Sequence, residues 1–334
     1  MKGLIEKIKE KKNLSRNESY LAMTNILEDA ADNEIYDFLI AMNEKEVTAD
    51  ELVGFVNGMK SKAISISPNV KMLVDTCGTG GDYKGTINIS TCAAIITASA
   101  GIPVAKHGNY SVSSKSGSAE VLESLGFNIN LEPEYCKKMI EETDFGFLLA
   151  PRFHPAMKRV APIRKKIGKR TIFNLLGPLC NPANPQAQLI GVYDEKLCGK
   201  FCYALKELGL ERALVVYGAG LDEISNTDET IACELNNGKI KSYKIKPEDF
   251  GFKRYQLEDI SGISPEENAK ELRDILNGKK GARRDIIVLN AGAGIYLGKG
   301  AVSLEEGIKK AEHLLDSGNS SRKLSGIIEY SKEF

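Results

Sequence analysis

The sequence contains no tryptophan, so stacking of a ligand on an indole ring is not part of its chemistry. Its seven cysteines are scattered without a C-x-x-C pair, and the closest two, Cys198 and Cys202, are one helical turn apart. This spacing argues against both a disulfide framework and a zinc site. A reducing compartment fits best, and we expect the protein to be cytoplasmic.

Long apolar runs are also missing. No run reaches the roughly 18 residues of a membrane span, and the charged start MKGLIEKIKEKKN lacks the apolar region of a signal peptide. Lysine plus arginine equals aspartate plus glutamate, at 45 each, so no overall field attracts nucleic acid or an anionic membrane. We expect neither as a partner, and any anion site has to be built locally.

The length of 334 residues predicts two domains. Residues 1–68 read as short amphipathic helices, with Leu21, Met23 and Ile26 at helical spacing and a capping box at Thr48 and Glu51. Short helices need another surface to bury their apolar faces. We therefore predict a small all-helical N-terminal domain, to which the proline-rich and cationic segment 151–182 returns.

From residue 70 to 334 the pattern predicts a larger α/β domain. Apolar strands alternate with helices, which is typical of a mainly parallel sheet flanked by helices. The predicted strands are 72–75, 102–106, 145–150, 188–193 and 213–218, and the predicted helices are 89–100, 117–125, 133–142 and 196–208. A hairpin with an Asn-Gly turn follows at 230–245, and helices at 266–276, 303–315 and 320–331 close the chain.

The first predicted strand runs into the glycine-rich stretch TCGTGGD, residues 76–82. Glycines let the backbone approach a ligand closely and aim several N–H groups at one spot, which favours an anion such as pyrophosphate. Ligands of parallel sheets bind beyond the carboxyl ends of the strands, where this loop is expected. A plain tight turn is the alternative, because neither the G-x-G-x-x-G nor the P-loop pattern is present.

Two further polar stretches belong to the same predicted edge. Thr86, Asn88, Ser90 and Thr91 open the next helix, where free N–H groups form a phosphate site, although such residues also serve as simple caps. Lys106 follows the apolar strand IPVA, and the stretch KHGNYSVSSKSGS, residues 106–118, supplies many small donors. Two phosphate groups on one ligand would need them, whereas a serine-rich surface loop is the alternative.

Charged side chains outside these loops add two candidates. Asp222 and Glu223 follow the strand at 213–218, and adjacent carboxylates near phosphates suggest Mg²⁺, with a solvated acidic turn as the alternative. Arg164 stands in the cationic run VAPIRKKIG. A guanidinium can clamp a carboxylate with two parallel hydrogen bonds, but spacing alone does not separate Arg164 from surface charge.

Taken together, these motifs resemble the anthranilate phosphoribosyltransferase family of tryptophan biosynthesis. The matching stretches, in the family's order and spacing, are GTGGD at 78–82, NIST at 88–91, KHGN at 106–109, SSKSGSAE at 113–120, APRFHPAMKRVAPIRKKIG at 150–168, FNLLGPLCNP at 173–182 and LDEIS at 221–225. The resemblance runs from about residue 15 to the end. It implies a helical domain beside a larger α/β domain, usually as a homodimer through the helical domains.

The resemblance also implies the reaction and the residues. The phosphoribosyl group of phosphoribosyl pyrophosphate is transferred to anthranilate, and pyrophosphate leaves. Phosphoribosyl pyrophosphate would contact Gly78, Thr79, Gly80, Gly81, Asp82, Thr86, Asn88, Ser90, Thr91, Lys106, His107, Gly108, Asn109, Ser114 and Ser118. Anthranilate would contact Gly78, Asn109, His154 and Arg164, and two Mg²⁺ ions would use Ser90, Asp222 and Glu223. No general base stands out, and Lys106 and Arg164 are expected to act in positioning and transition-state stabilisation.

Some positions depart from the family's pattern. Tyr110 stands where arginine is usual, Glu120 replaces a common aspartate, and Cys77 precedes the glycines. The glycine-rich stretch 290–298 looks like another phosphate loop, but the family places this loop in the structural core. Two alternatives stay open at this point: a pyrimidine nucleoside phosphorylase-like enzyme, and a nucleic-acid-binding paralogue of the same fold.

Overall fold

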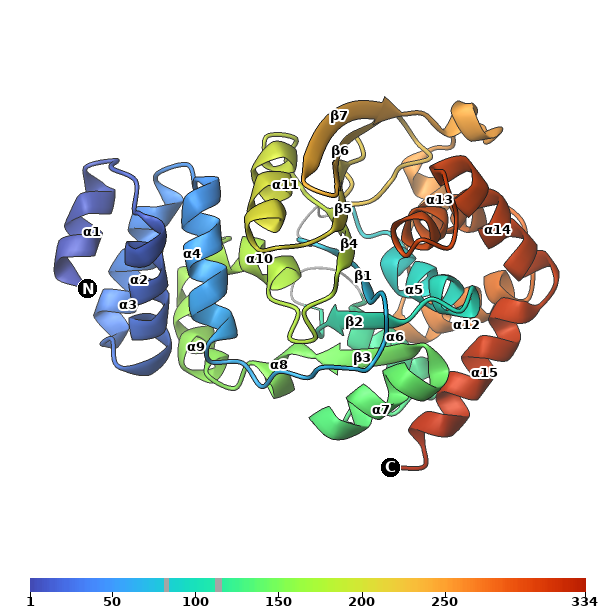
Figure 1. Cartoon of the computed structure of the whole chain (residues 1–334), viewed down its shortest axis with the longest axis horizontal. Helices are drawn as coiled ribbons and strands as arrows, with labels where there is room; N and C mark the ends of the chain where they lie inside the picture. The colour runs from blue at the N-terminus through green and yellow to red at the C-terminus, as the bar shows by residue number, and fades with distance from the viewer. Residues whose placement is uncertain (81–83, 112–115) are drawn as a thin grey trace.

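A computed structural model describes residues 1–80, 84–111 and 116–334 of the chain (Figure 1). The N-terminal part is helical, as predicted: α1 (Lys2–Lys9), α2 (Arg16–Glu28), α3 (Asp32–Asn43) and α4 (Ala49–Lys60). The predicted capping box of α4 is present, because Thr48 accepts the N–H of Glu51 and Glu51 accepts that of Thr48. None of the described helices is both long and apolar enough to cross a lipid bilayer.

One seven-stranded sheet forms the centre of the larger part, in the order β3-β2-β1-β4-β5-β6-β7. The strands are β1 (Val74–Gly78), β2 (Val104–Gly108), β3 (Phe145–Leu149), β4 (Ala187–Gly191), β5 (Arg212–Tyr217), β6 (Thr230–Asn236) and β7 (Lys239–Ile245). β1 to β5 are parallel, and β6 and β7 form the predicted antiparallel hairpin. Asn237 and Gly238 both have positive φ, as a tight Asn-Gly turn requires.

Helices cover both faces of this sheet, which confirms the predicted α/β fold class. They are α5 (Ile89–Ser99), α6 (Ser118–Leu125), α7 (Pro133–Thr143), α11 (Leu197–Glu207), α12 (Pro265–Leu276), α13 (Ala282–Leu297), α14 (Leu304–Asp316) and α15 (Asn319–Ser331). α5 and α13 pack on one face, and α11 packs against β5 and β6 on the other (Figure 1). The alternation along β5 shows this arrangement, since Leu214 and Val216 belong to one core and Ala213 and Val215 to the other.

The second core is shared between the N-terminal helices and the sheet, and segment 151–182 helps to form it. This segment contains α8 (Ala150–Phe153), α9 (Met157–Ile167) and α10 (Ile172–Leu176). α9 packs against α2 and α3, while α10 packs against α3 and α4 (Figure 1). Val160 and Phe173 are buried together with residues of both parts. The division of the chain at about residue 68 stays a prediction.

The stretch 290–298 lies in the structural core, as the resemblance implied, but it is not a loop: it is mostly the end of the buried helix α13. A Cβ on Gly292 would lie 2.6 Å from the backbone N of Ile308, and one on Gly294 would lie 2.4 Å from Thr97 Oγ1. These glycines therefore let α14 and α5 pack closely on α13. The helix was missed because glycine has low helix propensity and burial on all sides removes the amphipathic period.

Candidate active site

A cleft with a volume of about 810 Å³ lies at the carboxyl ends of β1 and β2. Its walls come from the glycine loop after β1, the start of α5, the end of β2, segment 151–182 and the turn after β5. It brings together the predicted residues Gly78, Thr79, Gly80, Thr86, Asn88, Ser90, Thr91, Lys106, His107, Gly108, Asn109, Ser118, His154, Arg164, Asp222 and Glu223. The predicted Gly81, Asp82 and Ser114 lie outside the described residues.

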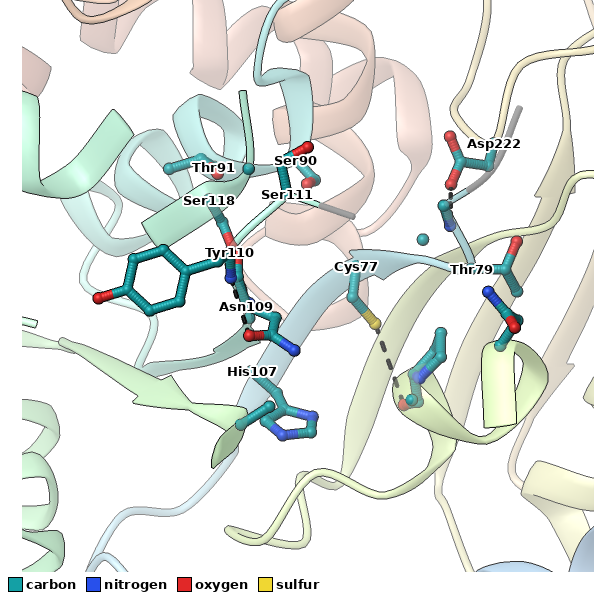
Figure 2. Close-up of a pocket in the computed structure, with 18 of the residues that line it drawn as sticks. Cys77, Thr79, Ser90, Thr91, His107, Asn109, Tyr110, Ser111, Ser118 and Asp222 are labelled. Carbon is teal, nitrogen blue, oxygen red and sulfur yellow. Dashed lines mark hydrogen bonds between the residues drawn. The ribbon is translucent and has the colours of Figure 1, made fainter. Parts of the chain in front are cut away.

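The glycine loop lies directly against the acidic turn. The backbone N–H of Gly80 donates to Asp222 Oδ2 over 2.7 Å (Figure 2). A Cβ on Gly78 would lie 2.3 Å from the same oxygen, so a larger residue there would displace the Asp222 carboxylate from the glycine loop. The buried hydroxyl of Thr79, on the cleft wall, has no hydrogen-bond partner among the described residues. Because it lies on the cleft wall, this hydroxyl can pair with a polar ligand bound there.

The start of α5 leaves some of its N–H groups available to a ligand, although that of Ile89 donates to the Ile87 carbonyl over 2.8 Å. Asn88 occupies the N-cap position, but its side chain makes no cap hydrogen bond. Instead its amide donates to the Ser116 carbonyl, and its oxygen accepts from Ser116 Oγ and Asn268 Nδ2, each over 3.1 Å. Asn88 is therefore held by its neighbours rather than by the helix. Unsatisfied N–H groups at a helix start are suited to a phosphate.

The sequence predicted that the second strand ends at Lys106, and this was wrong. β2 continues in register with β3 to Gly108. The side chain of Lys106 is 2% exposed, and its Nζ donates to the Thr76 carbonyl over 2.8 Å and to Ser90 Oγ over 3.2 Å. The ammonium thus joins β1 to the start of α5. Burial lowers the pKa of Lys106, while the nearby Asp75 raises it.

A buried polar network holds the strand that carries Lys106 in place. Asp75 accepts hydrogen bonds from Asn181 Nδ2 over 2.8 Å and from the backbone N–H of His107 over 3.4 Å. Burial raises the pKa of Asp75, and Lys106 lowers it. Asn181 also donates to the Ala105 carbonyl over 2.8 Å. The network therefore fixes β2 relative to β1 at the level where Lys106 enters the cleft.

Two histidines pack together at the junction with segment 151–182, with ring centroids 5.2 Å apart. Burial, with a smaller contribution from the neighbouring His154, lowers the pKa of His107 to about 3. Burial also lowers the pKa of His154 to about 4, although its Nε2 is bonded to the Cys180 carbonyl over 3.0 Å. The imidazole rings of His107 and His154 are therefore both neutral near pH 7. The backbone of Gly177 accepts a hydrogen bond from the His107 ring and partly offsets the lowering of its pKa.

These two histidines should make the protein acid-sensitive. Their pKa values of about 3 and about 4 lie below the roughly 6.5 of an unfolded chain, so unfolding takes up protons below pH 6.5. Each histidine should reduce the free energy of unfolding by up to about 1.4 kcal/mol per pH unit as pH falls from 6.5 towards its folded pKa. Urea denaturation at pH 7 and pH 5 measures this loss. The loss of unfolding free energy between pH 7 and pH 5 should be smaller in His154→Gln than in the parent. It should equal the parent's in the control His313→Gln, which replaces an exposed histidine on α14. Equal losses in the parent and both variants would contradict the assignment.

Arg164 faces the same cleft from α9, where it is half-buried. Its guanidinium lies 5.6 Å from the centroid of the Phe173 ring and donates to Asn174 Oδ1 over 3.4 Å. No carboxylate of the described chain forms an ion pair with it. Lys165 and Lys166, its neighbours on α9, are exposed. Burial therefore separates Arg164 from Lys165 and Lys166, and its place on the cleft wall separates it from Arg152, Arg159 and Arg170, which are also half-buried but do not line the cleft.

The two departures from the family's pattern that lie near the serine-rich stretch have different outcomes. Glu120 Oε1 accepts from the N–H of Ser111 over 2.9 Å and Oε2 from that of Gly117 over 3.1 Å, so one carboxylate ties together the residues that flank 112–115. Tyr110 lines the cleft and is 39% exposed, with its N–H donated to Asn109 Oδ1 (Figure 2). A phenol therefore stands on the rim where the family usually has a cation.

Sequence reasoning missed several residues that build this site. Gly191, at the end of β4, accepts the N–H of Thr79 over 2.9 Å, and Asn268 from α12 holds Asn88. A glycine inside an apolar strand indicates the close approach of another backbone. The sequence could therefore have predicted a close contact at Gly191. Asn268 and Asn181 carried none, because their partners lie far away in the sequence.

Comparison with known proteins places this fold and site in a class. Residues 2–63 match the helical bundle domain of the glycosyl transferase family, and residues 70–321 match the a/b domain of that family. An anthranilate phosphoribosyltransferase of Methanosarcina mazei is 49% identical over 100% of this chain and 90% of its own length. The crystal structure of the enzyme of that name from Thermus thermophilus has a TM-score of 0.93 at 38% identity, covering 98% of this chain and 99% of its own.

A more distant structure carries ligands. The anthranilate phosphoribosyltransferase of Saccharomyces cerevisiae, in complex with PRPP and Mg, has a TM-score of 0.87 at 28% identity and covers 96% of this chain and 94% of its own. The same enzyme is also known in complex with 4-fluoroanthranilate, with a TM-score of 0.84 at 27% identity and the same coverage. The fold and site thus define a phosphoribosyl-transferring member of the glycosyl transferase family. The chain belongs to the anthranilate phosphoribosyltransferase family, which confirms the predicted family and activity.

Proposed function

We propose that the cleft binds phosphoribosyl pyrophosphate on one wall and anthranilate on the other. The enzyme transfers the 5-phosphoribosyl group to the anthranilate amine, in the second step of tryptophan biosynthesis, and releases pyrophosphate. The observation that carries the assignment is a single cleft that brings together the glycine loop, the start of α5, the buried Lys106, the Asp222–Glu223 turn and Arg164. The unpartnered hydroxyl of Thr79 on its wall can pair with a polar ligand.

The phosphoribosyl pyrophosphate wall comprises the glycine loop, the start of α5 and the end of β2. The residues proposed for it are Gly78, Thr79, Gly80, Gly81, Asp82, Thr86, Asn88, Ser90, Thr91, Lys106, His107, Gly108, Asn109, Ser114 and Ser118. Backbone N–H groups of the loop and the helix start supply donors without bulk, and Lys106 supplies positive charge. The bound PRPP of the yeast relative supports this assignment.

The residues proposed for anthranilate are Arg164, His154, Asn109 and Gly78, all of which line the cleft; Asn109 and Gly78 are shared with the proposed phosphoribosyl pyrophosphate site. Arg164 can hold the carboxylate in a bidentate manner, since Phe173 and Asn174 already orient its guanidinium. The histidines are neutral near pH 7, so they add no competing positive charge for that carboxylate. The yeast relative in complex with 4-fluoroanthranilate supports a binding site for this acid.

Magnesium fits the donors that the cleft presents. Asp222 and Glu223 line it together with the hydroxyl of Ser90, and all three offer the hard oxygen ligands that Mg²⁺ prefers. Within residues 1–80, 84–111 and 116–334, no cluster of three or more His, Cys, Asp or Glu forms a closed metal cage. Mg²⁺ typically uses one or two carboxylates plus substrate phosphates, which matches this arrangement. We propose two ions at these residues, and when bound they would neutralise charge on the leaving pyrophosphate.

The residues of the chain divide the chemistry between them. The loop N–H groups and Lys106 stabilise the negative charge that develops as the bond from ribose C1 to the pyrophosphate oxygen breaks. Arg164 orients anthranilate so that its nitrogen forms the new bond at C1. The aromatic amine is neutral before attack and loses a proton afterwards, so attack needs no general base.

Removing one acidic charge tests the metal assignment. Glu223→Gln keeps the shape of the side chain and loses its charge, so activity should fall roughly 10- to 100-fold and recover partly at high Mg²⁺. The measurement is a Mg²⁺ titration of initial rates at saturating substrates. Glu229→Gln is a matched control, because Glu229 bonds Lys244 and Lys246 on the surface. If the Mg²⁺ dependence of Glu223→Gln equals that of the parent, Glu223 is not a ligand.

Two further proposals concern the environment of the enzyme. We propose a cytoplasmic homodimer that forms through the helical domain, where Tyr20 and Leu21 on α2 expose apolar surface. Leu21→Glu should shift sedimentation velocity towards the monomer if this face is the interface, whereas an unchanged sedimentation coefficient would refute it.

All seven cysteines are free and buried, in keeping with a reducing compartment.

A further inference from the structure

The position of the acidic turn is set on one side by the sheet. Asp222 lies over the ends of β1 and β4, which pair through Gly78 and Gly191. A Cβ on Gly191 would lie only 1.5 Å from the carbonyl oxygen of Asp222. No rotamer relieves a clash between a Cβ and a backbone atom, so any larger residue at 191 must displace the turn.

The other side of the turn is held by Asn290, in the interior of α13. This side chain is fully buried. Its Oδ1 accepts the N–H of Ile224 over 2.9 Å, and its Nδ2 donates to the carbonyl of the same residue over 2.9 Å. Ile224 directly follows Glu223, so one amide fixes both backbone groups of the residue next to the acidic pair.

The helix itself gives no reason for an asparagine at this position. Asn290 also donates to the Ile286 carbonyl over 2.8 Å, but that carbonyl is within the helix ladder and does not need a second donor. Asparagine has low helix propensity, and burying its amide is costly unless its hydrogen bonds are made. An apolar residue would suit the surrounding core better. The hydrogen bonds to the turn, and not the stability of α13, therefore explain why residue 290 is an asparagine.

We propose that Asn290 is a positioning residue, which together with Gly191 sets the Asp222–Glu223 turn at the place where the metal–pyrophosphate group binds. This inference rests on the proposed function of the two carboxylates. Asn290 does not line the cleft. It acts by holding the backbone of Ile224, and through it the carboxylates.

Binding of Mn²⁺ in the presence of phosphoribosyl pyrophosphate tests the role without relying on turnover. The amount of free Mn²⁺ is measured by electron paramagnetic resonance. Partners that orient metal ligands typically contribute 10- to 100-fold in metal affinity, so Asn290→Leu should weaken Mn²⁺ binding by about that factor. Asn290→Asp, which is isosteric but lacks the donor to Ile224, and Gly191→Ala should weaken it in the same direction. KM for anthranilate should change less than about twofold, because Arg164 is untouched.

Matched controls separate this role from loss of folding. Val288 is buried on the same helix, and because two residues turn a helix by about 200° it faces away from Asn290. Val288→Ala should therefore lower Tm and leave Mn²⁺ binding unchanged. Asp222→Asn should weaken Mn²⁺ binding directly. If Asp222→Asn weakens it and the folded Asn290→Asp does not, the positioning role is overturned. If Asp222→Asn also has no effect, the metal assignment itself is overturned.

Discussion

Arg164→Ala is expected to raise KM for anthranilate selectively. The guanidinium is half-buried, oriented by Phe173 and Asn174, and has no carboxylate partner within the described chain. Loss of a bidentate pair in a partly closed cleft should cost roughly 1.5–3 kcal/mol, or about a 10- to 150-fold rise in KM. The KM for phosphoribosyl pyrophosphate should be nearly unchanged, because its proposed donors belong to the opposite wall. Steady-state kinetics with each substrate varied in turn measures both values.

Two neighbouring variants serve as controls for Arg164. Arg164→Lys should show a partial defect, because an ammonium keeps the charge but lacks the planar fork of donors. Lys166→Ala should be nearly silent, since Lys166 is exposed and its Nζ lies 5.4 Å from the centroid of the Tyr36 ring. Equal defects in Arg164→Ala and Lys166→Ala, or a defect confined to phosphoribosyl pyrophosphate, would refute the carboxylate clamp.

Lys106→Met should give the opposite selectivity. The substitution keeps the buried apolar stem of the side chain but removes the ammonium that bonds Thr76 and Ser90. A charge-assisted hydrogen bond to phosphate contributes roughly 1.5–3 kcal/mol, so KM for phosphoribosyl pyrophosphate should rise about 10- to 150-fold. The KM for anthranilate should stay near the parent value. The same two-substrate kinetics provides the measurement.

Lys71→Met is the matched control for Lys106, because it removes an exposed lysine just before β1. It should leave both KM values unchanged. Thermal unfolding of both variants shows whether loss of the buried ammonium alters the fold. A folded Lys106→Met with an unchanged KM for phosphoribosyl pyrophosphate, or with a defect in anthranilate alone, would remove Lys106 from the phosphate wall.

The sequence predicted most of the fold because its apolar pattern changes period where the architecture changes. Helical spacing before residue 68 and strand–helix alternation after residue 70 are local signals, and so is the Asn-Gly turn of the β6–β7 hairpin. β1 and β2 were placed too early because their last residues are polar or glycine. Their register is set by pairing with β4 and β3, which no local pattern reveals.

The site was predictable where its residues follow a strand and was not where they act at a distance. The glycine loop and the acidic turn come directly after β1 and β5, so strand prediction placed them at one edge. Gly191 and Asn290 act on Asp222 and Ile224 across the fold. A glycine inside an apolar strand signals a close backbone approach at residue 191 but not its partner, and only the packing of α13 identifies Asn290. The functional role of Arg164 depends likewise on tertiary burial rather than on its place in a cationic run.

Fluorescence detection of N-(5-phosphoribosyl)anthranilate tests the central claim most directly. The purified protein is mixed with phosphoribosyl pyrophosphate, anthranilate and Mg²⁺, and each component is omitted in turn. Product should form only in the complete mixture and stop when a chelator removes the metal. In parallel, thymidine with phosphate should release no thymine, and a gel shift at moderate salt should show no nucleic-acid binding. Absence of product from the folded protein, or release of thymine in its place, would contradict the account.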